Sequence, residues 1–332
     1  MKIRAFITHK LKENYADCQD RFGVNPDAKS IAVSDGMSQS WQQKIWAQIL
    51  VDKYINSDWH PSKENIEPLC IQWRKDVISF INKLKEINAP ESLIYRNERN
   101  LSNGSSAGAT FVGVRFQCKE WEGTVLGDSC LIEWDGQSAT FHTSQEVECF
   151  DNQPDYFDSD FSKKGKGIPK NISGELKKGT VLFIVSDPFS DFLFEHNKQN
   201  DIAKYLEELR NISSHEKFEE LVDAWRNSGM HNDDTTLVIV ENDGKDDFSI
   251  DHEDKIVDLI RDEKEEEEES NSKDRNCTIG GILDESKDNI ASGLISEIIA
   301  IFKKVKKVKL KNKHFLNDAL HELLEKYEIA KK

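Results

Sequence analysis

Residues 123–140 read Gly-Thr-Val-Leu-Gly-Asp-Ser-Cys-Leu-Ile-Glu-Trp-Asp-Gly-Gln-Ser-Ala-Thr, and this stretch decides the class of fold. Its two short apolar runs, 123–126 and 131–134, are typical of strands. The second run leads through Asp135-Gly136, a hairpin turn signal, into a returning strand. Because no helix fits between these runs, the stretch favours antiparallel sheets over a βαβ unit.

Similar runs recur before residue 241 and alternate with helical patterns. Further strands are predicted at 31–33, 110–116, 181–185 and 236–240, and helices at 41–55, 65–87, 202–209 and 216–225. Within 65–87 the apolar residues recur at three- and four-residue spacing, which marks one face of a helix. Strands outnumber helices, so we predict an α+β fold in which helices cover antiparallel sheets.

Composition narrows the range of functions. The chain has 332 residues and a formal charge of −16, which disfavours nucleic-acid binding. No apolar run approaches the roughly 18 residues of a membrane span, and charged residues interrupt the first fourteen, unlike a signal peptide. The six cysteines form no C-x-x-C pair, which argues against a zinc ribbon or a disulfide framework. We therefore expect a cytoplasmic protein.

The C-terminal part of the sequence divides into an acidic segment and a tail. Residues 242–275 contain 15 acidic and 6 basic residues, and few large apolar ones. This composition predicts a solvated or disordered linker between a domain at 1–241 and a tail at 276–332.

The tail has two amphipathic stretches, 289–308 and 315–327, which predict a helical hairpin. Lysines gather between 303 and 313, so one hypothesis is binding to an anionic membrane surface or an acidic protein partner. The alternative, which we favour, is that the tail packs on the preceding domain or on itself, with its lysines in solvent.

Aspartates stand where predicted strands begin or end. They are Asp20, Asp35, Asp128, Asp187 with Asp191 four residues on, and Asp233. A single Asp-Gly is an ordinary turn signal, so the prediction of a metal site depends on the whole ordered set of aspartates. Crowded carboxylates require a neutralising cation, and Mg²⁺ and Mn²⁺ prefer oxygen ligands. Gly36, directly after Asp35, lets the main chain come close enough for its carbonyl to act as a ligand.

The blocks that contain these aspartates resemble the metal-dependent protein phosphatases of the type 2C class. In order, they are Cys-Gln-Asp-Arg-Phe at 18–22, Ala-Val-Ser-Asp-Gly-Met at 32–37, Ser-Ser-Ala-Gly-Ala-Thr at 105–110, Leu-Gly-Asp-Ser at 126–129, Val-Ser-Asp-Pro-Phe-Ser-Asp at 185–191 and Asn-Asp-Asp-Thr-Thr at 232–236. The Cys-Gln-Asp form, preceded by His9, is similar to a bacterial subgroup. Each block is a weak signal, but their order and spacing over residues 3–241 make the resemblance specific.

This resemblance implies a four-layer α/β/β/α sandwich with Mn²⁺ or Mg²⁺ at one end, between the sheets. It implies hydrolysis of phosphoserine or phosphothreonine on a protein substrate, by a water that two ions activate. Carried over by position, Asp35 bridges the ions, the Gly36 carbonyl binds one, and Asp187 and Asp233 complete the other. Asp20 and Asp191 orient ligands or waters, and Asp128 matches the position of a weaker third ion.

Several positions depart from the family pattern. Gln19 stands in place of glutamate, and Pro188 in place of glycine, which biases Asp187 toward extended geometry. Tyr15 stands where many members have the arginine that grips the substrate phosphate.

His9 is therefore either the phosphate contact or proton donor, or an ordinary surface histidine, while Lys10 and Lys12 are expected in solvent. The departures motivate an alternative function, a catalytically impaired pseudophosphatase that binds or scaffolds phosphoproteins.

Overall fold

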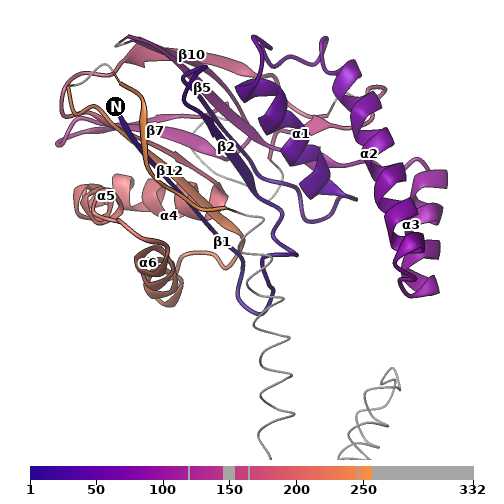
Figure 1. Ribbon diagram of the computed structural model, residues 1–332. Coiled ribbons are helices and arrows are strands. Elements are labelled where there is room, and N and C mark those ends of the chain that lie inside the picture. The colour runs from indigo at the N-terminus through magenta and orange to yellow at the C-terminus, as the bar shows by residue number, and fades with distance from the viewer. Residues whose placement is uncertain (119, 145–153, 164, 245–246, 256–332) are drawn as a thin grey trace, which may run out of the picture. The chain divides into compact units, whose positions relative to one another are not determined.

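The computed structural model describes residues 1–118, 120–144, 154–163, 165–244 and 247–255 (Figure 1). The predicted helical tail and most of the predicted acidic linker lie outside these residues. None of the helices in the described ranges combines the length and apolar character that a membrane span requires. The cytoplasmic location stays a prediction.

Two sheets form the centre of the fold. The six-stranded sheet has the order β13 (Ser249–Glu253), β1 (Lys2–Thr8), β12 (Thr235–Glu241), β11 (Val181–Val185), β7 (Cys130–Trp134) and β8 (Ala139–His142). The five-stranded sheet has the order β10 (Lys170–Glu175), β6 (Glu120–Leu126), β5 (Phe111–Gln117), β3 (Ser30–Ser34) and β2 (Arg21–Asn25). All neighbouring strands in both sheets are antiparallel except β1 and β13, which are parallel. A separate short pair joins β4 (Gly108–Ala109) to β9 (Phe157–Asp158).

Helices cover the outer face of each sheet (Figure 1). α1 (Gln43–Ile55) and α2 (Glu67–Glu86) belong to the five-stranded sheet, and α3 (Glu91–Ser102) packs beside α2. α4 (Asp187–Lys198), α5 (Ile202–Arg210) and α6 (His215–Asn227) cover the six-stranded sheet. Between the two sheets lies an apolar layer that includes Ile3, Val33, Val114, Leu182 and Val240, all completely buried. The predicted four-layer α/β/β/α sandwich is confirmed.

The hairpin that decided the fold class is also confirmed. β7 and β8 pair through the predicted turn, where Gly136 has a φ of +94°, a conformation that favours glycine. The Asp135 carboxylate accepts hydrogen bonds from the backbone N–H groups of Gln137 and Ser138, both at 2.8 Å. These bonds fix the turn locally, which explains why the sequence alone predicts it.

The six-stranded sheet extends beyond residue 242, where the sequence analysis places a domain boundary. β13 pairs with β1, and the N–H of the following residue, Asp254, donates to the Ala5 carbonyl at 3.0 Å. An edge strand pairs on one side only and tolerates charged residues, so the acidic composition conceals it. The rest of the predicted linker and the tail stay predictions.

Gly123 provides a stability prediction, because no side chain fits at this position. A Cβ added there would lie 2.3 Å from the Gly113 carbonyl oxygen on the neighbouring strand. We expect Gly123→Ala to lower the free energy of unfolding by about 2–3 kcal/mol, measured by urea denaturation. Gly136→Ala is the control: its added Cβ meets no atom within 4 Å, so it bears only the strain of its positive φ, about 1 kcal/mol. Equal losses for the two variants would contradict the packing argument.

Candidate functional site

The strand ends bring aspartates from distant parts of the sequence to one place. Asp35 follows β3, Asp187 follows β11, and Asp233 precedes β12. Burial raises the pKa of Asp35 well above its ordinary range, and so do the charges of its carboxylate neighbours, Asp187, Asp20, Asp128 and Asp233. The structure therefore places these five predicted residues within electrostatic reach of one another.

Hydrogen bonds fix the backbone at Asp35. Its N–H donates to Thr110 Oγ1 at 3.3 Å, and its carbonyl accepts from the Thr110 N–H at 2.9 Å. At Gly36, an added Cβ would lie 3.0 Å from the Gln19 carbonyl oxygen and 2.9 Å from Gln43 Cγ. Glycine therefore lets the segment after β3 approach the segment that carries Asp20.

Asp187 is the first residue of α4, so the extended geometry predicted for it from Pro188 is wrong. Proline in the first turn removes an N–H that has no partner within the helix, which makes this helix start favourable. Burial raises the pKa of Asp187 well above its ordinary range, followed by the charges of its neighbours, beginning with Asp128. Asp191 lies one turn further along α4, and burial, then the charge of Glu195, raises its pKa to about 6.

Two buried carboxylates support the cluster from within the protein. Asp20 is completely buried, and its Oδ2 accepts from Thr236 Oγ1 at 2.7 Å. Burial, then the charge of Asp234, raises the pKa of Asp20 to about 7. Asp234 accepts from the backbone N–H groups of Lys10 at 3.0 Å and Gln19 at 2.7 Å, and so holds residues 10–19 against β12. Asp234 was not among the predicted site residues, although the Asp233-Asp234 doublet was a signal for it.

Lys10 contacts the cluster directly, so the expectation that it lies in solvent is wrong. Its Nζ lies 3.3 Å from Asp233 Oδ1, and its side chain is 17% exposed. Burial lowers the pKa of Lys10, but the charges of Asp233, Asp234 and Glu13 outweigh this effect and raise it.

The side chain of Arg226, on α6, stabilises the segments that carry Lys10 and Asp233. Its Nη2 donates to the carbonyls of Asp233 at 2.8 Å and His9 at 3.1 Å. These bonds join the segment after β1 to the segment before β12. Arg226 was not among the predicted site residues, because its role depends on tertiary contacts.

His9 and Tyr15 lie side by side near the cluster. The half-buried His9 ring packs edge-on against Tyr15, with centroids 4.6 Å apart, and its Nδ1 lies 2.9 Å from the Lys10 carbonyl. The Tyr15 hydroxyl donates to Glu219 at 2.7 Å and lies 2.7 Å from His215 Nε2. Tyr15 thus belongs to a separate network, whereas Lys10 contacts the carboxylate of the predicted ligand Asp233.

The donor types at this place suit a hard divalent ion. Asp20 Oδ1 and Asp191 Oδ1 are buried and have no hydrogen-bond partner within the described ranges. No three His, Cys, Asp or Glu side chains in the described part of the chain stand in finished metal-binding geometry. The carboxylates therefore lie near one another, without the arrangement of a complete metal site in the described part of the chain. Mg²⁺ and Mn²⁺ keep several waters and need only a few protein oxygens, so the residues fit such ions by type.

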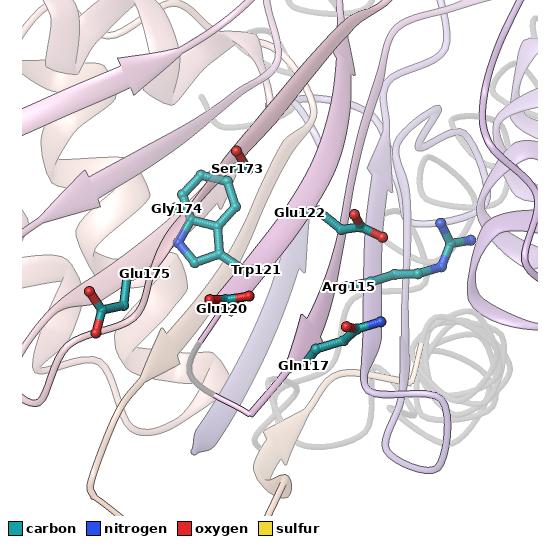
Figure 2. Close-up of a pocket in the computed structure, with 8 residues that line it drawn as sticks. All are labelled: Arg115, Gln117, Glu120, Trp121, Glu122, Ser173, Gly174 and Glu175. Carbon is teal, nitrogen blue, oxygen red and sulfur yellow. The ribbon is translucent and has the colours of Figure 1, made fainter.

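Two cavities complete the description. Figure 2 shows the residues that line one of them, on strands β5, β6 and β10. Its volume is about 380 Å³. Its Arg115 stacks on Tyr54 at 3.8 Å and donates to the carbonyls of Tyr54, Ser57 and Trp59, so the guanidinium is occupied by local structure. No predicted site residue lines this cavity. The other, of about 670 Å³, is lined by Gln19 and lies beside the aspartate cluster.

Comparisons with known proteins find similar structures. The chain is similar to the crystal structure of the serine/threonine phosphatase Stp1 from Staphylococcus aureus, with 13% identity over 71% of this chain and 93% of that one, at a TM-score of 0.46. The serine/threonine phosphatase of S. agalactiae is 15% identical over 72% of this chain and 98% of that one, at a TM-score of 0.44. The catalytic domain of the serine/threonine phosphatase PstP, in complex with two manganese ions, is 14% identical over 71% of this chain and 96% of that one, at a TM-score of 0.39. No protein-family model matches the sequence, and no curated protein does.

Proposed function

We propose that this protein is a metal-dependent phosphatase that hydrolyses phosphoserine or phosphothreonine on other proteins. The observation that carries the proposal is the convergence of aspartates from separate strand ends, beside the lysine Lys10. Such a concentration of acidic oxygen ligands needs cations to neutralise it. The motif order that resembles the type 2C class supports the choice of reaction.

Each predicted ligand has a place in this proposal. Two Mn²⁺ or Mg²⁺ ions would be held by Asp35, the Gly36 carbonyl, Asp187 and Asp233. Asp191, on α4, would orient ligands or waters, and Asp128 would be available to a weaker third ion. When bound, the ions supply an acidified water and stabilise charge on the phosphoryl oxygens.

The remaining residues bind and position. Lys10 provides a positive charge beside Asp233 that can attract the substrate phosphate. Asp20, which accepts a hydrogen bond from Thr236, positions the metal ligands. Asp234 positions the segment that carries Lys10. His9 lies next to Lys10 and stays the candidate proton donor to the leaving serine or threonine oxygen.

The test is phosphate release from a mixed pool of phosphoserine and phosphothreonine peptides, with Mn²⁺, with Mg²⁺ and with EDTA. We expect turnover with a divalent ion and none with EDTA. Absence of turnover from folded protein with every metal would contradict the proposal. Phosphopeptide binding would then be measured, because it is what the pseudophosphatase alternative requires.

Lys10 allows a specific prediction about the substrate. We expect Lys10→Met to raise KM for phosphopeptides about tenfold or more, because it removes a charge-assisted contact with the phosphate. Lys12→Met is the matched control, since Lys12 is exposed and only two residues away. An unchanged KM in Lys10→Met would remove Lys10 from the phosphate site.

A further inference from the structure

A groove of about 670 Å³ opens beside the aspartate cluster. Four segments form its walls: residues 13–19 before β2, residues 40–44 at the start of α1, Phe80 of α2, and α3. It is continuous with the cluster, because Gln19 lines the groove and its N–H donates to Asp234 Oδ2 at 2.7 Å. Gln43, another lining residue, packs against Gly36. A molecule bound in the groove would therefore end beside the predicted metal ligands.

The wall toward α3 is held in place by a buried amide. Asn97 is 4% exposed, and its Oδ1 accepts from Trp41 Nε1 at 3.1 Å and from Gln42 Nε2 at 2.9 Å. Its Nδ2 donates to the Leu93 carbonyl at 2.9 Å. The Gln42 backbone has a φ of +58°, and its carbonyl accepts from Trp73 Nε1. These bonds fix Trp41 and Gln42 before any ligand arrives, so little ordering is required on binding.

Two acidic side chains, Glu13 and Asp17, and two basic ones, Lys44 and Arg96, line the groove. Glu13 Oε1 lies 3.7 Å from Lys10 Nζ. Lys44 Nζ donates to the Ala16 carbonyl at 2.8 Å, and the charge of Asp17 acts on it. Arg96, exposed on α3, has no ion-pair partner within the described ranges. Of the two cations that line the groove, Arg96 is therefore the one that no hydrogen bond or ion pair in the described ranges engages.

We infer that this groove binds the polypeptide flanking the phosphorylated residue of a substrate, and that Arg96 selects an acidic side chain there. The inference rests on the proposed function and adds a substrate preference to it. The half-buried side chains of Trp41, Phe80 and Leu93 offer apolar surface to the same peptide. Because Arg96 lies on α3 and is not among the predicted metal ligands, it acts on specificity and not on the reacting phosphate.

The experiment compares kcat/KM for a set of phosphothreonine peptides that are otherwise uncharged. Each peptide carries one glutamate or one lysine at a single position on either side of the phosphothreonine. We expect the wild type to favour glutamate over lysine at one position by about 3- to 10-fold, and Arg96→Glu to reverse that preference. Arg99→Glu is the control, because Arg99 is exposed on the same helix and does not line the groove.

p-Nitrophenyl phosphate separates the two proposals, because this small substrate has no flanking polypeptide for the groove to bind. If no variant hydrolyses it with Mn²⁺, the proposed function fails. If all variants hydrolyse it equally and Arg96→Glu leaves the glutamate-to-lysine ratio unchanged, the groove inference is overturned while the phosphatase stands. A reversal in Arg99→Glu as large as in Arg96→Glu would also overturn it, since it would indicate a long-range charge effect.

Discussion

Replacing Asp35 with asparagine is expected to reduce metal-dependent phosphate release by about 10²–10³-fold. Asparagine keeps the size of the side chain and loses its charge. Besides burial, four neighbouring aspartate charges raise the pKa of Asp35, among them those of Asp187 and Asp233. It is also the residue to which the type 2C resemblance assigns the bridge between the two ions. The measurement is kcat with saturating Mn²⁺ and a phosphopeptide that the wild type hydrolyses.

A second readout separates loss of metal from loss of fold. In EDTA, Asp35→Asn should unfold at the wild-type temperature or above it, because it removes one of several crowded negative charges. Adding Mn²⁺ should raise the unfolding temperature of the wild type, since a ligand that binds the native state stabilises it. This rise should be smaller in Asp35→Asn. Asp27→Asn, at an exposed position, should match the wild type in both measurements. Full activity in Asp35→Asn would refute the assigned metal site.

Features that depend on neighbouring residues were predictable from the sequence. The β7–β8 hairpin follows from alternating strand runs around Asp135-Gly136, and its hydrogen bonds are formed within the turn itself. The aspartates at strand ends could also be predicted from the sequence, because an apolar run that ends at an aspartate is a local pattern. The sheet order that brings Asp20, Asp35 and Asp187 together was available only through the resemblance to a known family, since it depends on pairing between distant strands.

Features that depend on distant partners could not be predicted in this way. Lys10 looks like any lysine in a charged segment, and only the fold places it beside Asp233. α3 was missed because Asn97 is its only fully buried residue in the described structure, so it has little of the apolar periodicity that identifies a helix. The groove inference depends on that same helix, which explains why nothing in the sequence pointed to it.

A second network of ionisable groups joins β13 to the segment that leads into Asp20. His215 Nδ1 lies 2.9 Å from Asp254 Oδ2, and its Nε2 lies 2.7 Å from the Tyr15 hydroxyl. With both ring nitrogens protonated, His215 donates to Asp254 and to Tyr15, while Tyr15 donates its own proton to Glu219 at 2.7 Å. Asp254 also accepts from the Ile7 N–H at 2.9 Å. One imidazolium therefore connects α6, β1, β13 and the Tyr15 segment.

The pKa values indicate when this network is intact. Burial lowers the pKa of His215, but hydrogen bonds and charges from Asp254 and Glu219 outweigh it and raise the pKa to about 10 from 6.5. The contact with His215, whose Nε2 lies 3.4 Å from Glu219 Oε1, is the main reason that the pKa of Glu219 falls to about 2 from 4.5. The His215 contribution to stability is complete below pH 6.5 and declines as the pH rises toward 10. The Glu219 contribution is complete above pH 4.5 and declines as the pH falls toward 2.

We therefore expect His215→Ala to lower the free energy of unfolding by about 2–3 kcal/mol at pH 6, because it leaves the buried Asp254 carboxylate without its principal cation. This value lies below the usual range for a fully buried pair, since the His215 side chain is 22% exposed. The difference between wild type and variant should shrink as the pH approaches 10, where the wild type itself loses the imidazolium. Urea denaturation at several pH values between 6 and 10 measures both effects, with the exposed His231→Ala as the control. A difference that stays constant over this range would show that His215 contributes by packing, with no share from its charge.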